Sequence, residues 1–437
     1  GKMVEKDVDV TIVDAQFYDL SIEEFINKIK QIKPQYVGIS MLTSEYSTLL
    51  HLAASELKKM DPNIKVIAGG VHVTTEYMRV ISDPNIDYAV RGEGEYTFLG
   101  LIRHLNGNGA LPSEGLVFMD KGEVVVQKHV VVDDLSKLPM PDYKLVNMND
   151  YTSVGGRYGP LRPPSFPHAR LVITRGCPVG CSFCQVESIS GKPVRSPKPE
   201  SVVDELAYLK DNYGITSFII DDDNIVIKKK FFKAFLRELI ERDLNLIFII
   251  QAFAIFALDD EMLDLMKEAG CVKINFPIES GDQEILKNII KKPLDLKRTK
   301  NLFKRCRDIG LDYGTFLVVG NIGRDVVETL DQIKDSFSFC RKMRVIPHVS
   351  LLTAYPGSEV LDIAKEKDYL VPGFDWDDLI IQKFQLQTPL WTPQELMSLV
   401  EREKLKLHWY MKFYSFKKTL LNILDRLNSD PMKLFRS

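Results

Sequence analysis

The residues that could do chemistry begin with a crowded group of cysteines. Three of the six cysteines, Cys177, Cys181 and Cys184, lie in the segment ITRGCPVGCSFCQVES at residues 173–188. Disulfide bonding would leave one of the three unpaired and suits secreted proteins better. A structural zinc site needs four ligands, and neither a second CxxC pair nor paired histidines follow nearby. Three thiolates this close together fit an iron–sulfur cluster in which one iron has no protein ligand.

The remaining cysteines are isolated from one another. Cys271, Cys306 and Cys340 occur singly, in segments with the pattern of helices or strands. We interpret them as buried small hydrophobic residues. The sequence therefore predicts a single cluster, held by the cysteine loop, and no auxiliary cluster.

Composition limits the class of protein. The chain has 437 residues, of which 45% are hydrophobic and 27% charged, and its formal net charge is -3. This length predicts two or three domains, and the charge argues against a nucleic-acid partner. No apolar run approaches the roughly 18 residues of a membrane span, and the first ten residues lack the layout of a secretory signal. We therefore expect a cytoplasmic protein with no transmembrane segment.

The elements that must position these cysteines form two α/β series. In the first series, short apolar runs alternate with helix-like stretches at residues 21–33 and 43–61, where apolar residues recur three and four positions apart. This alternation predicts a parallel, Rossmann-like sheet over residues 1–110, in a domain whose N-terminal part is expected to precede residue 1. The expected strands are residues 8–13, 36–40, 64–68 and 87–90.

A connector and a longer α/β series follow. Residues 111–165 contain many glycines and prolines and predict a hairpin around Asp120-Lys121-Gly122. Residues 166–372 predict a partial (β/α)6 barrel, with fewer units than the eight of a closed barrel. Residues 373–437 predict a helical region, which starts at Thr392 with a capping box. The expected barrel strands are residues 171–174, 217–220, 246–250, 272–278, 313–319 and 348–352.

The cysteine spacing resembles the signature of a known family. C-x3-C-x2-C, with Phe183 inside the final pair and a predicted strand just before it, is similar to the motif of the radical S-adenosylmethionine (radical SAM) enzymes. The resemblance implies that Cys177, Cys181 and Cys184 hold a 4Fe–4S cluster whose fourth iron is chelated by S-adenosylmethionine. It also implies an external electron donor such as flavodoxin or ferredoxin, and a 5′-deoxyadenosyl radical that takes hydrogen from a substrate carbon.

Two further stretches resemble the family's contacts to S-adenosylmethionine. IIDDDN (219–224) ends the second barrel strand, where the resemblance implies that Asp222 or Asp223 pairs with the cofactor amine. Helix capping is the alternative role for these two aspartates. PIESGDQEIL (277–286) ends the fourth strand, where the resemblance implies that Glu279 and Ser280 contact the ribose or the methionine part.

A third stretch departs from the family pattern. FLVVGNIGRDVVET (316–329) stands where the family has G-x-P-G-E-T. Gly320 is kept and is assigned to S-adenosylmethionine binding, as is Phe183 from its place in the cysteine motif. Ile322 replaces the proline and Arg324 the acid, so the usual acid contact lacks its carboxylate here.

The first series resembles the cobalamin-binding Rossmann-type domain that precedes the barrel in one large radical SAM subfamily. The stretches VGISMLTSEYS, VIAGGVHVTTE and VRGEGEYTFLGLI carry this resemblance, and their small residues at strand ends expose backbone amides. The D-x-H-x-x-G motif that supplies a histidine to cobalt is not found, and His72 is not at the ligand position. The resemblance therefore implies cobalamin without a protein imidazole. The residues assigned to this site are Ser40, Leu42, Gly69, Gly70 and Gly92.

Together these features predict a cobalamin-dependent radical SAM enzyme that methylates an unactivated carbon of a small-molecule, natural-product or lipid-type substrate. The alternative with the same architecture is a radical SAM cyclase or carbon–carbon bond-forming enzyme, with or without cobalamin. An electron carrier is a third reading, but a carrier normally saturates its cluster with four protein ligands. For the aromatic and basic C-terminal region, we weigh a lid or interaction surface against an amphipathic helix packed on the barrel.

Overall fold

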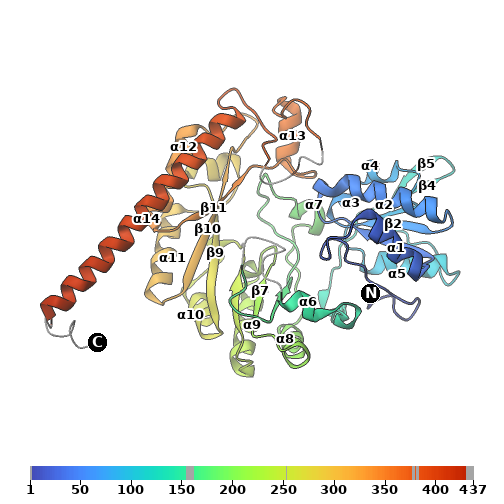
Figure 1. Cartoon of the computed structure of the whole chain (residues 1–437), viewed down its shortest axis with the longest axis horizontal. Coiled ribbons are helices and arrows are strands. Elements are labelled where there is room, and N and C mark those ends of the chain that lie inside the picture. Colours follow the sequence, from blue (N-terminus) through green and yellow to red (C-terminus); the bar gives the residue numbers. More distant parts are fainter. Residues whose placement is uncertain (1, 154–161, 252, 376–378, 380–382, 430–437) are drawn as a thin grey trace.

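The computed structural model describes residues 2–153, 162–251, 253–375, 379 and 383–429. It contains a five-stranded and a six-stranded sheet, each with helices packed against it (Figure 1). Residues 154–161 of the predicted connector, part of the 374–378 aromatic stretch and the last eight residues lie outside the described part. Within the described residues, no helix is long and apolar enough to cross a membrane.

The N-terminal sheet has the strand order β1-β2-β3-β4-β5. Its first three strands are parallel, and Ser40 at the end of β1 pairs with Gly69 at the end of β2. The strands are β1 (Tyr36–Ser40), β2 (Lys65–Gly69), β3 (Tyr88–Val90), β4 (Leu116–Asp120) and β5 (Glu123–Val126). The accompanying helices are α1 (Ile22–Ile32), α2 (Ser47–Met60), α3 (Val71–Thr75), α4 (Tyr77–Ile81) and α5 (Glu95–Leu105).

Two details of this sheet differ from the expectation. Residues 8–13 form no strand, because their valines pack against the two apolar clusters of the domain without joining a hydrogen-bonded ladder. The hairpin expected in the connector does form, but β4 pairs antiparallel with β3 and so extends the N-terminal sheet. We therefore propose that the N-terminal unit includes the hairpin and ends after β5.

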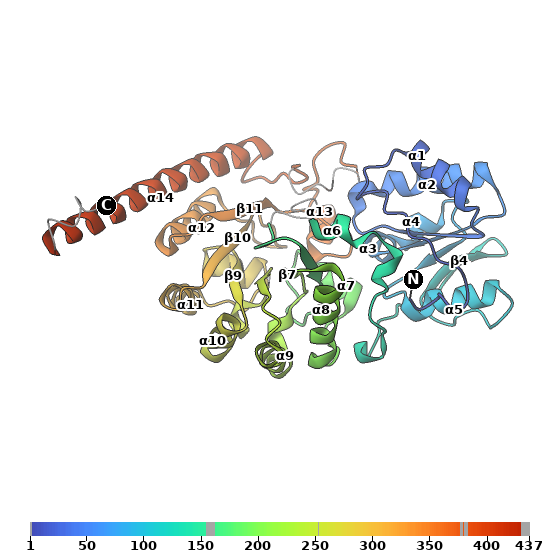
Figure 2. The ribbon, with the colours of Figure 1, turned by 60° about the horizontal axis from the view of Figure 1, so that its bottom comes forward.

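The second sheet confirms the predicted partial (β/α)6 barrel. Its strands are all parallel and run in the order β6 to β11, with helices outside them (Figure 2). The strands are β6 (His168–Leu171), β7 (Ser217–Ile220), β8 (Ile247–Ile250), β9 (Cys271–Glu279), β10 (Asp312–Val319) and β11 (Pro347–Leu351). The helices are α8 (Pro199–Tyr213), α9 (Lys229–Arg242), α10 (Asp260–Glu268), α11 (Leu296–Asp308), α12 (Leu330–Met343) and α13 (Glu359–Glu366).

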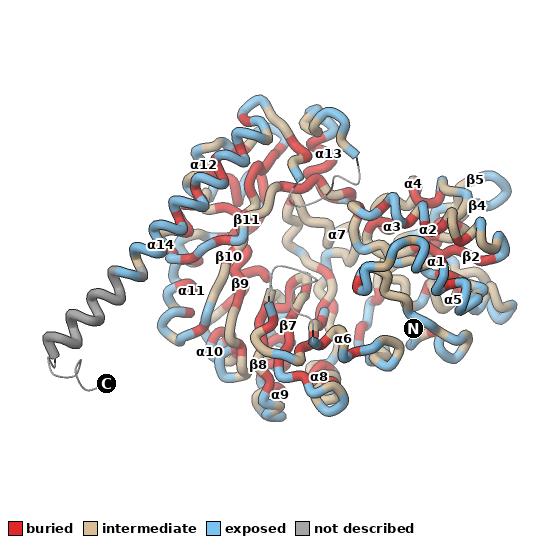
Figure 3. Tube along the Cα trace, in the orientation of Figure 1, coloured by how far each residue is buried: buried red, intermediate tan, exposed pale blue. Residues whose placement is uncertain are grey.

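The barrel core lies between this sheet and its helices, as the buried residues along β7 to β10 show (Figure 3). Phe218 on β7 and Phe248 on β8 stack with ring centroids 4.8 Å apart, and both are fully buried. Cys271, Cys306 and Cys340 are buried in the same core, as the sequence predicted. These apolar contacts hold the strand ends that carry the loops described below.

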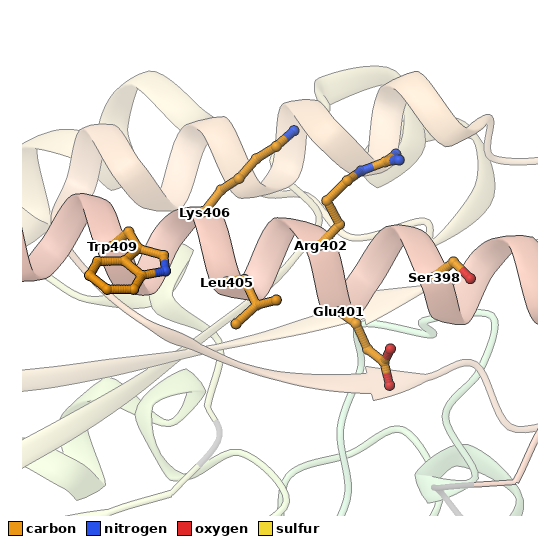
Figure 4. A pocket seen from close by; sticks show the side chains of 6 residues that line it. All are labelled: Ser398, Glu401, Arg402, Leu405, Lys406 and Trp409. Atoms are coloured by element: carbon orange, nitrogen blue, oxygen red, sulfur yellow. The ribbon is translucent and has the colours of Figure 1, made fainter.

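The C-terminal helix α14 (Pro393–Ser429) packs on α12, on the outside of the barrel. It begins with the predicted capping box, since the Glu395 carboxylate accepts from the Thr392 N–H at 2.9 Å. The outward face of its described first part is exposed (Figure 3), and its far part extends away from the barrel (Figures 1 and 2). A hollow on that face is lined by α14 alone, and none of the predicted site residues borders it (Figure 4).

Candidate functional site

The cysteine loop leaves the end of β6 and reaches α7 (Val186–Ser190) beside the loop that follows β7. Cys177, Cys181 and Cys184 are free thiols, and all three are partly exposed. The Asn224 side-chain amide donates to Cys177 Sγ at 3.3 Å, and its oxygen accepts from the Ala254 N–H at 2.8 Å. Asn224 belongs to IIDDDN, but nothing in that stretch indicates its contact with Cys177.

The three thiols lie close enough to influence one another's charge. Burial raises the pKa of Cys181 to about 12, which the Lys292 ammonium partly opposes, and burial raises the pKa of Cys184 to about 11. Ligands of this kind bind as thiolates, so metal binding must displace their protons. Among the described residues, no three Cys, His, Asp or Glu side chains converge as ligands of one metal ion would. The cysteines of a cluster bind different irons and do not need to converge.

Asp222 organises the start of the cysteine loop. Its buried carboxylate accepts hydrogen bonds from the backbone N–H of Ile173 and from both the N–H and the hydroxyl of Thr174. Burial raises the pKa of Asp222 to about 7, and these three donors oppose the rise. The same bonds explain why β6 ends at Leu171, since Ile173 and Thr174, which were expected in the strand, bond to this side chain instead. In this arrangement, the donors of the loop occupy the Asp222 carboxylate.

Asp223 is the more accessible member of the pair. One of its oxygens accepts from the Gly176 N–H at 2.9 Å, next to Cys177, and its side chain is only partly buried. Burial raises the pKa of its carboxyl, which the charges of Arg175 and Arg195 partly offset. We therefore favour Asp223 over Asp222 as the partner of a cofactor amine.

Glu279 ends β9 in a conformation that side chains rarely adopt. Its φ is 63°, and the pairing of β9 with β10 shifts register just before it. Its carboxylate is buried and forms an ion pair with the buried Lys292, at 2.9 Å. A non-glycine residue held in this region costs about 1–3 kcal/mol and often marks a functional position. Lys292 was missed because nothing in IIKKPL distinguishes it from a surface lysine.

The neighbouring predicted residues have mainly structural contacts. Ser280 is fully buried, and its hydroxyl lies 3.1 Å from that of Ser336 and accepts from the Asp282 N–H. Phe183 is partly buried against the barrel core. Neither side chain has contacts that by themselves identify a ligand, so their assignment to S-adenosylmethionine stays a prediction.

Gly320 belongs to a loop held by a buried glutamate. Glu328 Oε2 accepts from the N–H of Gly320 at 2.9 Å and from the Asn321 N–H at 3.0 Å. Burial raises the pKa of Glu328 to about 7. Arg324, in the place of the family's acid, instead pairs with Glu366 on α13. The backbone amide of Gly320 is thus already bonded, and its role toward S-adenosylmethionine stays a prediction.

The residues assigned to cobalamin gather at one edge of the N-terminal sheet. Ser40 and Gly69 end adjacent parallel strands, and Leu42, in the following loop, has 69% of its surface exposed. Gly70 has a φ of 96°, and a Cβ there would lie 2.5 Å from the Met41 carbonyl oxygen. An exposed leucine beside strand-end glycines suits a flat apolar ligand lying against the sheet edge.

Gly92 differs from the other assigned residues in its surroundings. Its φ is 92°, and a Cβ would lie 2.1 Å from the Val130 carbonyl oxygen. Its N–H donates to the Thr74 hydroxyl at 3.0 Å. Only glycine fits this close approach between the loop after β3 and the segment after β5. Its contact with cobalamin stays a prediction.

The comparisons with known proteins agree with this geometry. Two family models match: the Radical SAM superfamily over residues 171–335 and the B12 binding domain over residues 2–102. The cytidylyl-2-hydroxyethylphosphonate methyltransferase of Streptomyces wedmorensis is 29% identical over 428 residues, covering 89% of this chain and 78% of that protein. The anaerobic magnesium-protoporphyrin IX monomethyl ester cyclase of Rubrivivax gelatinosus is 27% identical over 403 residues, covering 89% and 67%.

Solved structures share the architecture of both sheets. The radical S-adenosylmethionine methyltransferase TsrM from Kitasatospora setae, with cobalamin and a 4Fe–4S cluster bound, has a TM-score of 0.71 at 19% identity, covering 85% of this chain and 75% of that one. The cobalamin-dependent S-adenosylmethionine radical enzyme OxsB has a TM-score of 0.66 at 14% identity, covering 94% and 69%. At these identities the likeness shows a common fold.

A partial barrel with a three-cysteine loop at its strand ends defines the radical SAM class of enzyme. This chain belongs to the radical SAM enzymes that carry an N-terminal B12-binding domain. The two matching domains assign it S-adenosylmethionine with a 4Fe–4S cluster, and cobalamin, as cofactors. The residues present fit these groups: three free thiols for the cluster, accessible carboxylate oxygen at Asp223, and an open sheet edge beside Leu42.

We expect Glu279→Gln to weaken S-adenosylmethionine binding while iron content is unchanged. Loss of one charge-assisted hydrogen bond costs ~1.5–3 kcal/mol, roughly ten- to hundredfold in affinity. The variant also leaves Lys292 buried without its ion pair, which destabilises the fold. Binding of S-adenosylmethionine is therefore measured by equilibrium dialysis for Glu279→Gln and also for Glu279→Gln/Lys292→Met, which removes both charges. Unchanged affinity in both variants would assign Glu279 a purely structural role.

Proposed function

We propose that this protein is a cobalamin-dependent methyltransferase that acts on an unactivated carbon of a small molecule. When bound, S-adenosylmethionine and the reduced cluster supply a 5′-deoxyadenosyl radical, and cobalamin supplies the methyl group. The observation that supports the proposal is that the cysteine loop and the unit with the candidate cobalamin site are in contact within one chain. The cysteine loop contacts the N-terminal unit, since α7 packs on α3 and Arg195, in the segment after α7, bonds to Glu93.

The chain's own residues then have separate tasks. Asp222 and Asn224 hold the cysteine loop in shape through Thr174 and Cys177. Asp223 and Glu279 present carboxylates beside the thiols, where both raise the pKa of Cys184 and where an ammonium or hydroxyl group would be oriented. An external electron donor such as flavodoxin or ferredoxin belongs to the same proposal.

The alternative outcome is ring formation or carbon–carbon coupling on the same scaffold. It is favoured by the similarity to the Rubrivivax gelatinosus cyclase, which is nearly as high as that to the methyltransferase. The two relatives supply the first substrates to test, a cytidylylated hydroxyethylphosphonate and a magnesium-porphyrin ester. The C-terminal region is no guide to the choice, since α14 lies on α12 rather than over the strand ends.

An anaerobic assay with a chemical reductant separates the two reactions. Methyl transfer is expected to give both deoxyadenosine and S-adenosylhomocysteine, together with a product heavier by one methylene unit. Cyclisation or coupling would give deoxyadenosine without S-adenosylhomocysteine. Absence of both products, with the cluster intact and each candidate substrate present, would contradict the assignment of these substrates.

A further inference from the structure

A buried ion pair joins the N-terminal unit to the barrel. Arg195 donates to both oxygens of Glu93, from Nη1 to Oε2 at 2.8 Å and from Nη2 to Oε1 at 2.7 Å. The two side chains are only 8% and 6% exposed. Burial alone would raise the pKa of Glu93, but the bonds from Arg195 and the Val132 N–H, together with the charge of Arg175, hold it below its usual value. The glutamate is therefore ionised at the junction.

The barrel side of this ion pair leads directly to the cysteine loop. Arg195 and Arg175 pair through their backbones, with N–H to O distances of 2.9 and 3.1 Å. Arg175 Nη1 also lies 3.2 Å from Glu93 Oε2 and 2.8 Å from Glu95 Oε1. Two residues after Arg175 comes Cys177, whose N–H bonds to the Gly191 carbonyl at 3.1 Å. Glu93 thus bonds to both segments, at Arg175 and at Arg195, that form the stem of the cysteine loop.

The other side leads to the proposed cobalamin edge. Glu93 follows Gly92, whose N–H donates to the Thr74 hydroxyl, and that hydroxyl donates to the Gly70 carbonyl at 2.9 Å. A continuous path of covalent and hydrogen bonds therefore runs from Gly70 through Glu93 to Cys177. The sequence gives no sign of this path, because Glu93 and Arg195 lie 102 positions apart.

We propose that Glu93 is a positioning residue that couples cobalamin binding to cluster binding. The inference rests on the proposed function. Cluster ligation orders the stem that carries Arg175 and Arg195, and cobalamin orders the loops that carry Glu93. Each event lowers the entropy cost of forming the shared network for the other, so the two bindings favour each other reciprocally.

The coupling is measured as a ratio of two dissociation constants. The affinity of wild-type protein for hydroxocobalamin is measured by equilibrium dialysis, once with a reconstituted cluster and once without it. We expect binding to be at least about fivefold tighter with the cluster present, at the lower end of typical coupling between sites. In Glu93→Gln, whose side chain keeps its size but loses its charge, the ratio should fall close to one.

Glu95→Gln is the matched control. Glu95 is the neighbouring acidic partner of Arg175, but its side chain is 26% exposed and it does not bond to Arg195 in the described structure. We expect this variant to keep the wild-type ratio. Thermal melts followed by circular dichroism establish that each variant is folded. If Glu93→Gln does not fold, Arg175→Gln removes one arm of the network from a more exposed position and should lower the ratio partially.

The possible outcomes are distinct. A ratio near one in the wild type, or an unchanged ratio in Glu93→Gln, overturns the coupling while leaving the proposed function intact. An equal fall of the ratio in Glu95→Gln also overturns the coupling through Glu93, because removing any negative charge at the junction would then have the same effect. Wild-type protein that binds no cobalamin overturns both the coupling and the proposed function.

Discussion

Replacing Cys177, Cys181 and Cys184 together with alanine is expected to lower bound iron from about four atoms per chain to almost none. The three thiols are free, lie in one loop and interact electrostatically. The barrel should stay folded in the variant, because its apolar core and the bond from Thr174 to Asp222 do not involve the thiols. The loss is therefore one of ligands and not of the fold.

Iron and sulfide analysis after anaerobic reconstitution checks this expectation, together with the visible and electron paramagnetic resonance spectra. Cys340→Ala is the matched control, since Cys340 lies on α12 and is fully buried in the barrel core. It should keep its iron and lose only some stability. Iron well above four atoms per chain in the wild type, or a cluster that survives in the triple variant, would show that other ligands are involved.

The sequence predicted best the strands that consist of one short apolar run and pair with a neighbouring strand. The run at 217–220 matches β7, whose four residues are all buried, as in a parallel strand covered on both faces. The run at 36–40 matches β1, an edge strand in which only Val37 is buried. The run at 8–13 is equally apolar, but its residues pack beside the sheet without a ladder. Hydrophobicity alone does not distinguish these two outcomes.

The site was predictable where motif residues are close in sequence and not where partners are distant. The cysteine spacing indicated the cluster loop, and IIDDDN indicated polar residues beside it. The choice between Asp222 and Asp223 depends on which carboxylate the N–H groups of Ile173 and Thr174 reach, which only the fold decides. Lys292 was unpredictable for a similar reason, because it lies 13 positions after Glu279 and a helical turn, Ile285–Ile289, returns it to the end of β9.

Replacing Gly69 with leucine is expected to abolish cobalamin retention without unfolding the protein. Gly69 ends β2, and a Cβ there would meet its nearest neighbour, Val90 Cβ, at an ordinary distance of 3.9 Å. The added side chain would then stand at the carboxyl end of β2, where the cofactor is proposed to lie. Gly70 is a poorer choice, because its φ of 96° and its contact with Met41 would strain the fold itself.

Gly109→Leu controls for the general effect of a bulky residue, since a Cβ at Gly109 would have only an ordinary contact with Arg103, at 3.6 Å. Retention is measured by the visible spectrum after incubation with hydroxocobalamin and gel filtration. We expect the wild type and Gly109→Leu to retain cobalamin and Gly69→Leu to lose it. Retention by Gly69→Leu at the wild-type level would place the cofactor elsewhere.

Electron paramagnetic resonance of the Co(II) form tests whether a histidine of the N-terminal unit binds cobalt. In the N-terminal unit, His72 is fully buried with Nδ1 2.9 Å from the Ser44 hydroxyl, and His51 pairs with Asp83 at 2.7 Å. His104 bonds to the Gly109 carbonyl at 3.1 Å. Because each imidazole is held by a protein partner, we expect a spectrum without nitrogen superhyperfine splitting. Splitting that disappears in His72→Gln would mean that the loop after β2 opens and gives its histidine to cobalt.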